Sequence, residues 1–421
     1  MKYPIGSKDI VYSERRKLRL AYFVTHPIQY QAPMLRRIAQ EPDIELKVFF
    51  SSNISVRGDG YNDEGFNVRL KWDIPLLDGY AHEFLPVVRD SNTLGFAKPL
   101  NSGIKGRVKA GEFDAVWLHG YSTLTNLRAI WAAGRLKIPV LLRTDSTLFD
   151  RPRSKLKLAA KSAFFGALRS CVSGVLSVGD ANTEYWRHHL GRDIPVFPCL
   201  YAVDNEFFQS ACRIAAASRE EFRASLGLDA DRTVILFAAK LMPRKRCVDL
   251  LEAFLMLSKA GGVKPLPYLL IVGDGEERAM LEDVAKQANP GDIRFLGFRN
   301  QSELPRFYDL CDVFVLASVD EPWGLAINEV MNAGRAVIVT DEVGCQKDLV
   351  RDGVNGCVVR ARDPQSLAEC LRRVLGDEQT RRAMGAESLR IIDGYSFEQN
   401  VAGLRQALEA LVPGFSATRA G

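Results

Sequence analysis

Residues 320–329 read DEPWGLAINE and follow the apolar run Val313–Ala317 after a gap of two residues. An aliphatic run of this length without polar alternation is typical of a strand buried on both faces of a parallel sheet. The stretch therefore lies at the carboxyl end of a predicted strand, where Pro322 restricts the loop and Gly324 lets the backbone approach a ligand closely. A helix is expected to begin near Leu325, and the N–H groups of its first turn suit a diphosphate.

Two glutamates frame this stretch. Glu321 lies in the predicted loop, and Glu329 lies just over one turn inside the predicted helix. Carboxylates placed in this way can accept hydrogen bonds from separate hydroxyls of one ligand, such as a sugar and a ribose. Two glutamates eight residues apart are usually solvated surface acids, but the preceding strand and the Pro-Trp-Gly turn favour a binding site.

Short apolar runs alternate with helical segments in both halves of the chain. The runs predict strands at Leu18–Val24, Ile44–Phe50, Ala115–Leu118, Pro139–Leu142, Gly174–Val178, Thr233–Ala238, Tyr268–Val272, Ile293–Leu296, Val313–Ala317 and Ala336–Val339. This alternation indicates βαβ units around a parallel sheet. We therefore predict an α/β fold of two Rossmann-like domains whose parallel sheets face each other across a deep cleft. Ligands of such sheets bind beyond the carboxyl ends of the strands, which places the site in the cleft.

The alternation lapses between Leu200 and Ser218, where we expect the join between the domains. Residues 1–17 are predicted to be a flexible leader. Residues 18–203 are assigned to an N-terminal Rossmann-like domain and residues 204–395 to a C-terminal one.

The last predicted helix covers residues 396–412. It begins with a capping box, in which Ser396 is the N-cap and Gln399 follows three residues later. Its apolar residues at helical spacing are Val401, Leu404, Leu408 and Leu411. An amphipathic helix of this kind must pack on an apolar surface, and we expect it to pack back on the N-terminal domain.

Composition limits the function. The net charge of +5 over 421 residues fits an anionic small molecule, and the basic residues are too dispersed for a nucleic-acid site. The eight cysteines lack CxxC spacing and there are five histidines, so we expect reduced thiols, no metal site and a cytoplasmic protein. The first 17 residues lack the apolar core of a signal peptide, and no apolar run approaches the length of a membrane span.

Other loops of the second half also follow predicted strands. Lys240 and Lys245, five residues apart, follow Thr233–Ala238 and can clamp two phosphates, although a basic surface loop is the alternative. Gly273 and Gly275 form a glycine turn after another strand, which by itself is a weak signal. Phe298 and Arg299 follow a third strand and Gly297.

Polar side chains also follow strands of the first half. They are His26, Gln29, His119, Tyr121, Arg143 and Asp145. A single histidine at a strand end is more often structural than functional. The position of these residues at the carboxyl ends nevertheless directs them to the expected cleft.

Two further stretches have alternative interpretations. Residues Arg151–Arg169 interleave basic and apolar side chains, which is typical either of a packed helix or of contact with an anionic membrane. His188 and His189 are adjacent, and adjacent side chains on a helix point about 100° apart. A surface helix therefore explains the two histidines better than a metal site.

The segment EPWGLAINE resembles the Glu-x7-Glu signature of the retaining glycosyltransferases of family 4, which have the GT-B fold. Trp323 stands where that family usually has Phe. The resemblance implies that Glu321 lies by the donor sugar and that Glu329 binds the nucleotide ribose. It also implies donor contacts by the backbone around Pro322, Trp323, Gly324 and Leu325.

Other motifs extend this resemblance over nearly the whole chain from about residue 18, most strongly in the second half. Residues 237–246 resemble the family segment G-R-L-x-x-x-K with Ala239 and Lys240 in place of Gly and Arg. The resemblance implies that Lys240 and Lys245 neutralise the donor diphosphate, that Gly273 and Gly275 belong to a G-x-G element, that Phe298 and Arg299 cradle the base, and that His119 faces the donor sugar.

The first half departs from the family at its first loop. Residues 25–33, THPIQYQAP, replace the usual Gly-Gly loop and resemble a subgroup of bacterial members. The resemblance of this segment to the bacterial subgroup suggests that His26 or Gln29 lines the acceptor side. Tyr121, Arg143 and Asp145 are assigned to the same side.

We therefore expect a retaining glycosyltransferase that moves a sugar from a nucleoside-diphosphate sugar, carried by GDP or UDP, to a glycan, lipid or small-molecule acceptor. No permanently bound cofactor, metal or nucleic acid is expected, while peripheral membrane contact and a homodimer are left open. The alternatives are a GT-B epimerase or phosphorylase, or a nucleotide-sugar-binding protein without turnover. A nicotinamide dehydrogenase is disfavoured because no complete GxGxxG follows a strand.

Overall fold

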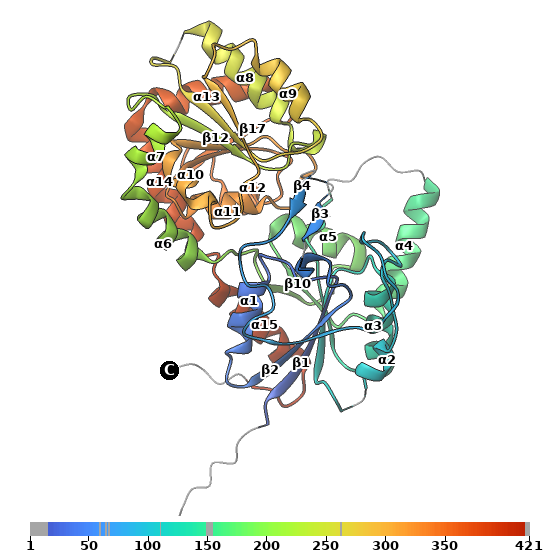
Figure 1. Cartoon of the computed structure of the whole chain (residues 1–421). Helices are drawn as coiled ribbons and strands as arrows, with labels where there is room; N and C mark the ends of the chain where they lie inside the picture. Colours follow the sequence, from blue (N-terminus) through green and yellow to red (C-terminus); the bar gives the residue numbers. More distant parts are fainter. Residues whose placement is uncertain are drawn as a thin grey trace, which may run out of the picture.

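The computed structural model describes residues 16–58, 60–63, 65, 68–109, 111–148, 155–261 and 263–416, and these form two lobes (Figure 1). Most of the predicted leader, residues 1–15, lies outside the described residues. Residues 151–154 of the basic stretch lie outside them as well.

The N-terminal lobe contains a sheet of seven strands, all parallel, in the order β11-β10-β9-β8-β1-β2-β5. These strands are β1 (Leu18–Val24), β2 (Ile44–Phe50), β5 (Ala81–Phe84), β8 (Ala115–His119), β9 (Val140–Arg143), β10 (Gly174–Ser177) and β11 (Val196–Pro198). Its helices are α1 (Ala32–Ala39), α2 (Ile104–Arg107), α3 (Leu124–Arg135), α4 (Lys155–Arg169), α5 (Asp180–Leu190) and, from the end of the chain, α15 (Phe397–Leu411). Two antiparallel hairpins join β3 (Tyr61–Asp63) to β4 (Val68–Leu70) and β6 (Val87–Arg89) to β7 (Leu100–Asn101).

The C-terminal lobe contains a parallel sheet of six strands in the order β14-β13-β12-β15-β16-β17. These strands are β12 (Val234–Ala238), β13 (Tyr268–Val272), β14 (Ile293–Gly297), β15 (Val313–Leu316), β16 (Ala336–Thr340) and β17 (Gly356–Val359). The helices of the lobe are α6 (Asn205–Ala216), α7 (Arg219–Ser225), α8 (Cys247–Ala260), α9 (Arg278–Ala285), α10 (Leu304–Leu310), α11 (Leu325–Met331), α12 (Gln346–Leu349), α13 (Pro364–Gly376) and α14 (Glu378–Ile392). The prediction of two Rossmann-like domains with parallel sheets is confirmed.

Both sheets are covered by helices on both faces, which explains why their central strands are mostly apolar. Along β12, Val234 and Leu236 pack into the core on one face, while Ile235 and Phe237 pack into the core on the other. Side chains alternate between the two faces of a strand, so a strand with two covered faces needs an apolar residue at every position. The sheet of the N-terminal lobe likewise separates two cores.

Helix α15 joins the end of the chain to the N-terminal lobe. Ser396 caps it by accepting a hydrogen bond from the Gln399 backbone N–H at 3.4 Å. Its apolar residues, including Leu404 and Leu408, pack in the same core as β1 and β2. Gly403 lies against the backbone of Pro198 in β11, and a side chain at Gly403 would collide with that carbonyl group. The last helix therefore lies against the first sheet, as Figure 1 shows.

The order of the strands locates the expected site. In each sheet the strands are first added on one side of the first strand and later on its other side. This reversal of strand order lies between β1 and β8 in the first sheet and between β12 and β15 in the second. At such a point neighbouring loops diverge beyond the carboxyl ends of the strands, which leaves a crevice for a ligand.

Candidate functional site between the lobes

A cavity of about 570 Å³ lies between the two lobes. Its C-terminal walls are the loops that follow β12, β14 and β15, and its N-terminal walls include the loop after β1 and the β3–β4 hairpin. The predicted site residues that line it are His26, Gln29, Asp145, Lys240, Lys245, Phe298, Arg299, Glu321, Pro322, Trp323, Gly324 and Leu325. The structure therefore brings residues distant in sequence together around one cavity.

Basic side chains concentrate on the C-terminal wall. Lys245 makes an ion pair with Glu321, which is only 7% exposed, and Arg244 lies 3.9 Å from the other oxygen of that carboxylate. Lys240 is paired with Asp63 at 2.7 Å. Each lysine thus already has a carboxylate partner, and an anionic ligand would compete with Glu321 and Asp63 for the same cations.

Gly273 and Gly275 support the loop that carries Lys240. Gly273 has φ 134° and Gly275 has φ 157°, and a side chain at either position would collide with a backbone carbonyl of the loop after β12. Two hydrogen bonds hold the loops together, from Ala239 N to Val272 O at 3.1 Å and from Leu241 N to Asp274 O at 2.9 Å. These glycines therefore permit close packing behind the cavity and do not line it.

Glu329 lies in α11, as the sequence predicts, beside a small cavity of about 70 Å³. This small cavity shares Gln29, Tyr30, Gln301 and Leu325 with the larger one. The Tyr308 hydroxyl donates a hydrogen bond to Glu329 Oε2 at 2.5 Å. Burial raises the pKa of Glu329 to about 7, and the hydrogen bond from Tyr308 partly opposes that shift. This carboxylate therefore changes its charge near neutral pH.

Trp323 connects the motif to the segment that joins the lobes. Its indole Nε1–H donates to Asn328 Oδ1 at 2.8 Å, and Asn328 Nδ2 donates to the Tyr201 carbonyl at 3.0 Å. The ring is 3% exposed and contacts Gly179 of the N-terminal lobe. An indole needs a buried acceptor that a phenyl ring does not need, and Asn328 of the same motif supplies it.

Asp145 and Glu321 contribute carboxylates from opposite lobes to the same cavity. Burial raises the pKa of Asp145, and the negative charge of Glu321 raises it further. His26, on the same N-terminal wall, has its pKa lowered to about 4 by burial. At neutral pH the ring of His26 is therefore uncharged, and Asp145 is more basic than an exposed aspartate.

His119 ends β8 but is not among the residues that line the cavity. Tyr22 donates a hydrogen bond to Gln31 Oε1 at 2.8 Å, so the Gln31 amide nitrogen faces His119 Nε2 at 3.0 Å. Burial, together with the positive charge of Arg143, lowers the pKa of His119 to about 3. The neutral ring accordingly carries its proton on Nδ1, which has no hydrogen-bond partner among the described residues.

Two residues assigned to the acceptor side lie elsewhere. Arg143 is 1% exposed, and its guanidinium donates to the Cys199 carbonyl at 3.0 Å instead of reaching the cavity. The Tyr121 hydroxyl contacts that of Tyr185, and its ring packs at 5.3 Å from the ring of Phe165. Both side chains turn into the helices and core of the N-terminal lobe, because the end of a strand does not determine on which side of the sheet a side chain lies.

The β3–β4 hairpin contributes cavity residues that the motifs do not identify. Tyr61, Asp63 and Gly65 line the cavity, as does Trp72 just beyond the hairpin. The same arm reaches the C-terminal lobe, where Asn300 Nδ2 donates to the Lys71 carbonyl at 2.8 Å. The available signal in the sequence was the polar stretch 57–66, whose Gly, Asp and Asn residues are typical of a turn.

Within the described residues, no group of three or more His, Cys, Asp or Glu side chains is arranged to hold a metal ion. The charged groups of the cavity are the basic side chains of Lys240, Arg244, Lys245 and Arg299 and the carboxylates of Asp63, Asp145 and Glu321. Such a set can bind an anionic group with the lysines and hydroxyl groups with the carboxylates.

Comparison with known proteins agrees with this arrangement. Residues 218–390 match the family model described as glycosyl transferases group 1. An uncharacterized glycosyltransferase of Methanocaldococcus jannaschii is 36% identical over 157 residues, which are 37% of this chain and 39% of that protein. The D-inositol 3-phosphate glycosyltransferase of Nocardia farcinica is 28% identical over 214 residues, which are 50% of this chain and 47% of that protein. The chain thus spans less than half the length of these two relatives.

Solved structures resemble the whole molecule. The crystal structure of Anabaena HepE in complex with UDP and glucose superposes with a TM-score of 0.67 at 18% identity, covering 93% of this chain and 100% of that one. At this identity the similarity defines the fold, which is that of two facing Rossmann-like lobes. The chain therefore has the GT-B fold, and residues 218–390, which make up most of its C-terminal lobe, are similar to the glycosyl transferases group 1.

Proposed function

We propose that this protein transfers a glycosyl group from a nucleoside-diphosphate sugar to an acceptor nucleophile, with retention of the anomeric configuration. The observation that carries the proposal is the cavity between the lobes, where Lys240, Lys245 and Glu321 meet beyond the carboxyl ends of β12 and β15. Donor binds on the C-terminal wall and acceptor on the N-terminal wall. The corresponding domains are residues 204–395 and residues 18–203, with α15 attached to the latter.

Stabilisation of the leaving group supplies most of the proposed catalysis. Negative charge develops on the diphosphate as the bond to the sugar breaks, and fixed cations lower the energy of that state. Lys240 and Lys245 exchange their carboxylate partners for the phosphates when donor binds. Glu321, released from Lys245, then accepts hydrogen bonds from the sugar hydroxyls.

The remaining donor contacts follow the shape of the cavity. Glu329 accepts hydrogen bonds from the ribose hydroxyls in the adjoining small cavity, while Phe298 and Arg299 border the base. The backbone from Pro322 to Leu325 lies beside the phosphates. His119 is proposed to support the donor sugar. Its Nδ1–H has no hydrogen-bond partner among the described residues, which favours a contact of this kind when donor is bound.

Asp145 is the proposed group on the acceptor side. It lines the cavity opposite Glu321, and its raised pKa suits a carboxylate that accepts a proton from an acceptor hydroxyl. His26 and Gln29 border the same wall and would orient the acceptor.

The proposed donor nucleotide is UDP, with GDP as the alternative. The solved structure of Anabaena HepE contains UDP, and its fold is shared by this chain. The chain belongs to retaining family 4 in this proposal and requires no metal ion. All eight cysteines are free thiols and seven are buried, which supports a reducing, cytoplasmic setting.

A transfer assay tests the proposal. The protein is incubated with a panel of UDP- and GDP-sugars and candidate acceptors, and released nucleotide and the anomeric configuration of the product are measured. We expect nucleotide release that depends on acceptor and a product with the donor's configuration. Donor binding without acceptor-dependent release would instead support a nucleotide-sugar-binding protein, and an inverted product would refute retention.

A further inference from the structure

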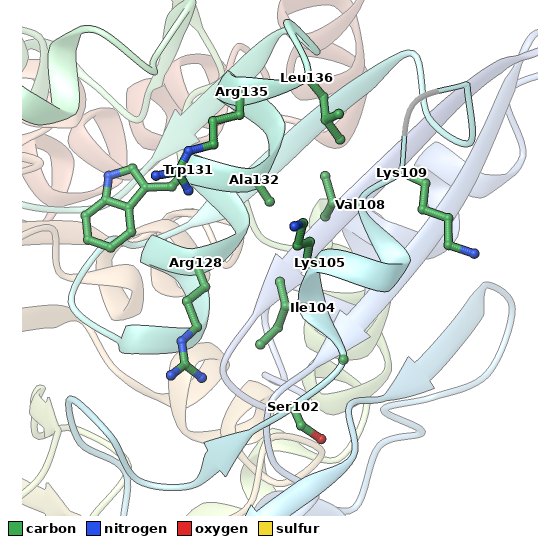
Figure 2. Close-up of a pocket in the computed structure, with 11 residues that line it drawn as sticks. Ser102, Ile104, Lys105, Val108, Lys109, Arg128, Trp131, Ala132, Arg135 and Leu136 are labelled. Carbon is green, nitrogen blue, oxygen red and sulfur yellow. The ribbon is translucent and has the colours of Figure 1, made fainter.

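A separate cavity of about 680 Å³ opens on the surface of the N-terminal lobe between α2 and α3. It shares no lining residue with the site between the lobes. Figure 2 shows this α2–α3 groove. Its floor is apolar, with Ile104 and Val108 buried, and its rim includes two exposed apolar side chains, Trp131 at 39% and Leu136 at 40% exposure. Glycosyl transfer as proposed above uses none of these residues.

Four exposed cations surround the apolar floor: Lys105, Lys109, Arg128 and Arg135. None of the four forms an ion pair with another described residue. In contrast Arg107, which lies in α2 together with Lys105, pairs with Glu83 at 2.5 Å. Arg128 donates a hydrogen bond to the Asn101 carbonyl at 3.2 Å, but no carboxylate of the described chain neutralises any of the four charges. The surface is therefore complementary to an anionic partner.

The charge of the chain is strongly uneven around this groove. Residues 98–169 contain fourteen Lys and Arg residues but only four Asp and Glu residues, although the whole chain contains 56 and 51. The rest of the chain therefore has a net negative charge. A positive region on an otherwise acidic protein orients the molecule as it approaches an anionic surface.

Apolar residues are exposed near the same region. Leu156 and Leu158 of α4 are 81% and 51% exposed, whereas Phe165 and Leu168 of the same helix are buried in the core that α3 also covers. Helices α2, α3 and α4 lie along one side of the N-terminal lobe (Figure 1). Exposed leucine and tryptophan beside lysine and arginine are typical of a surface that lies in the headgroup region of a bilayer.

We propose that the α2–α3 groove, with Trp131 and Leu136 on its rim and the four cations around it, is a docking surface for an anionic phospholipid bilayer. The cations meet the lipid phosphates, and the apolar rim enters the boundary between headgroups and acyl chains. In the described part of the chain no helix has the length and apolar character of a membrane span. The proposed contact is peripheral and electrostatic, so salt should weaken it.

Vesicle sedimentation tests the charge requirement. Wild-type protein should sediment with vesicles that contain phosphatidylglycerol and stay in solution with phosphatidylcholine alone. The quadruple variant Lys105→Gln, Lys109→Gln, Arg128→Gln, Arg135→Gln should bind phosphatidylglycerol vesicles at least about tenfold more weakly. A matched control replaces four exposed cations of the C-terminal lobe with Gln, namely Lys259, Lys286, Arg351 and Arg372, and should bind like wild type.

Tryptophan quenching tests the apolar contact separately. Trp117, Trp186 and Trp323 are buried, and Trp72 is partly buried at the cavity between the lobes, away from the α2–α3 groove. Quenching by brominated lipids should therefore arise chiefly from Trp131 and should be largely lost in Trp131→Phe. Equal binding by the quadruple variant, or a tryptophan signal that brominated lipids do not quench, would overturn the proposal. Binding of RNA that is lost in the quadruple variant, without quenching by lipid, would assign the surface to nucleic acid instead. Neither assay contains a sugar nucleotide, so its result is independent of the proposed transferase activity.

Discussion

The carboxylate of Glu329 is expected to make donor binding depend on pH. Ribose hydroxyls donate to the ionised form, whereas burial raises the pKa of the free group to about 7. Affinity for an intact UDP-sugar should therefore increase from pH 6 to pH 8, with a slope that approaches about tenfold per pH unit below the pKa. Isothermal titration calorimetry at several pH values measures the slope, and the intact donor is used because its diphosphate has no proton to lose in this range.

The Glu329→Gln variant is the control for this pH dependence. It should bind the UDP-sugar more weakly and with little change in affinity over the same pH range. If wild type and Glu329→Gln have equal slopes, another group is responsible and the ribose assignment is contradicted.

Asp145 is predicted to act on the acceptor. Replacement by Asn keeps the size of the side chain but removes its basicity, so kcat should fall about 10²–10⁴-fold while the dissociation constant for donor stays within about twofold. Steady-state kinetics and calorimetry separate the two quantities. The neighbouring Ser146→Ala variant should retain both, and an Asp145→Asn enzyme with near-normal kcat would exclude the proposed role.

The positions of the cations and of Glu321 on the C-terminal wall could be predicted from the sequence, because each of these residues follows a strand that is recognisable from its apolar composition. Lys240, Lys245 and Glu321 accordingly line the cavity. Arg143 and Tyr121 also follow strands, yet they turn into the lobe, where Arg143 donates to a buried carbonyl and Tyr121 packs against aromatic rings. Position along the chain predicts the edge of a sheet, but the direction of a side chain depends on packing that one sequence does not reveal.

The β3–β4 hairpin is an arm that extends from the N-terminal lobe to the C-terminal wall of the cavity. Asp63 pairs with Lys240, and Asp73 accepts from the Ser302 backbone N–H at 3.2 Å. Because Asp63 competes with phosphate for Lys240, Asp63→Asn should tighten binding of a nucleoside diphosphate by about two- to fivefold, as expected for a partly exposed ion pair. Calorimetry with UDP and GDP measures this change.

The control for the arm is Asp73→Asn, which removes the contact with Ser302 but leaves the pair between Asp63 and Lys240. It should not tighten nucleotide binding. Weaker binding by Asp63→Asn would mean that the carboxylate positions Lys240 for the phosphates, contrary to the expected competition.

Central strands of the two large sheets were predictable, and of the four edge strands only β14, expected at Ile293–Leu296 and found at Ile293–Gly297, was predicted. The predicted bounds of Leu18–Val24, Ile44–Phe50 and Tyr268–Val272 agree with β1, β2 and β13, each of which has two neighbours in its sheet. The edge strands β5, β11 and β17 were missed. In β5, for example, Ala81 and His82 are exposed, so the apolar pattern of a doubly covered strand is absent.

Contacts between the lobes extend beyond the cavity. The Asp348 carboxylate accepts from the Asp180 backbone N–H at 3.2 Å at the start of α5, and Lys347 pairs with Glu184 at 3.1 Å. Trp323 and Asn328 connect α11 to Tyr201 in the linking segment. The two-domain arrangement and its cleft followed from the repeated strand pattern, but these contacts depend on how the lobes pack and have no local signal in the sequence.

A ligand that binds between the lobes of the folded molecule stabilises it by an amount that grows with the ratio of ligand concentration to dissociation constant, so thermal unfolding tests the central claim most directly. Melting temperatures are measured with UDP, GDP, ADP, dTDP and NAD, for wild type and Glu329→Ala. At about 100 times its dissociation constant a ligand adds roughly 2.7 kcal/mol, or a shift of about 5–10 °C for domains of this size. We predict such a shift with UDP or GDP and its loss in Glu329→Ala. No shift with any nucleoside diphosphate, or a shift with NAD alone, would contradict a nucleotide-sugar site in this cleft.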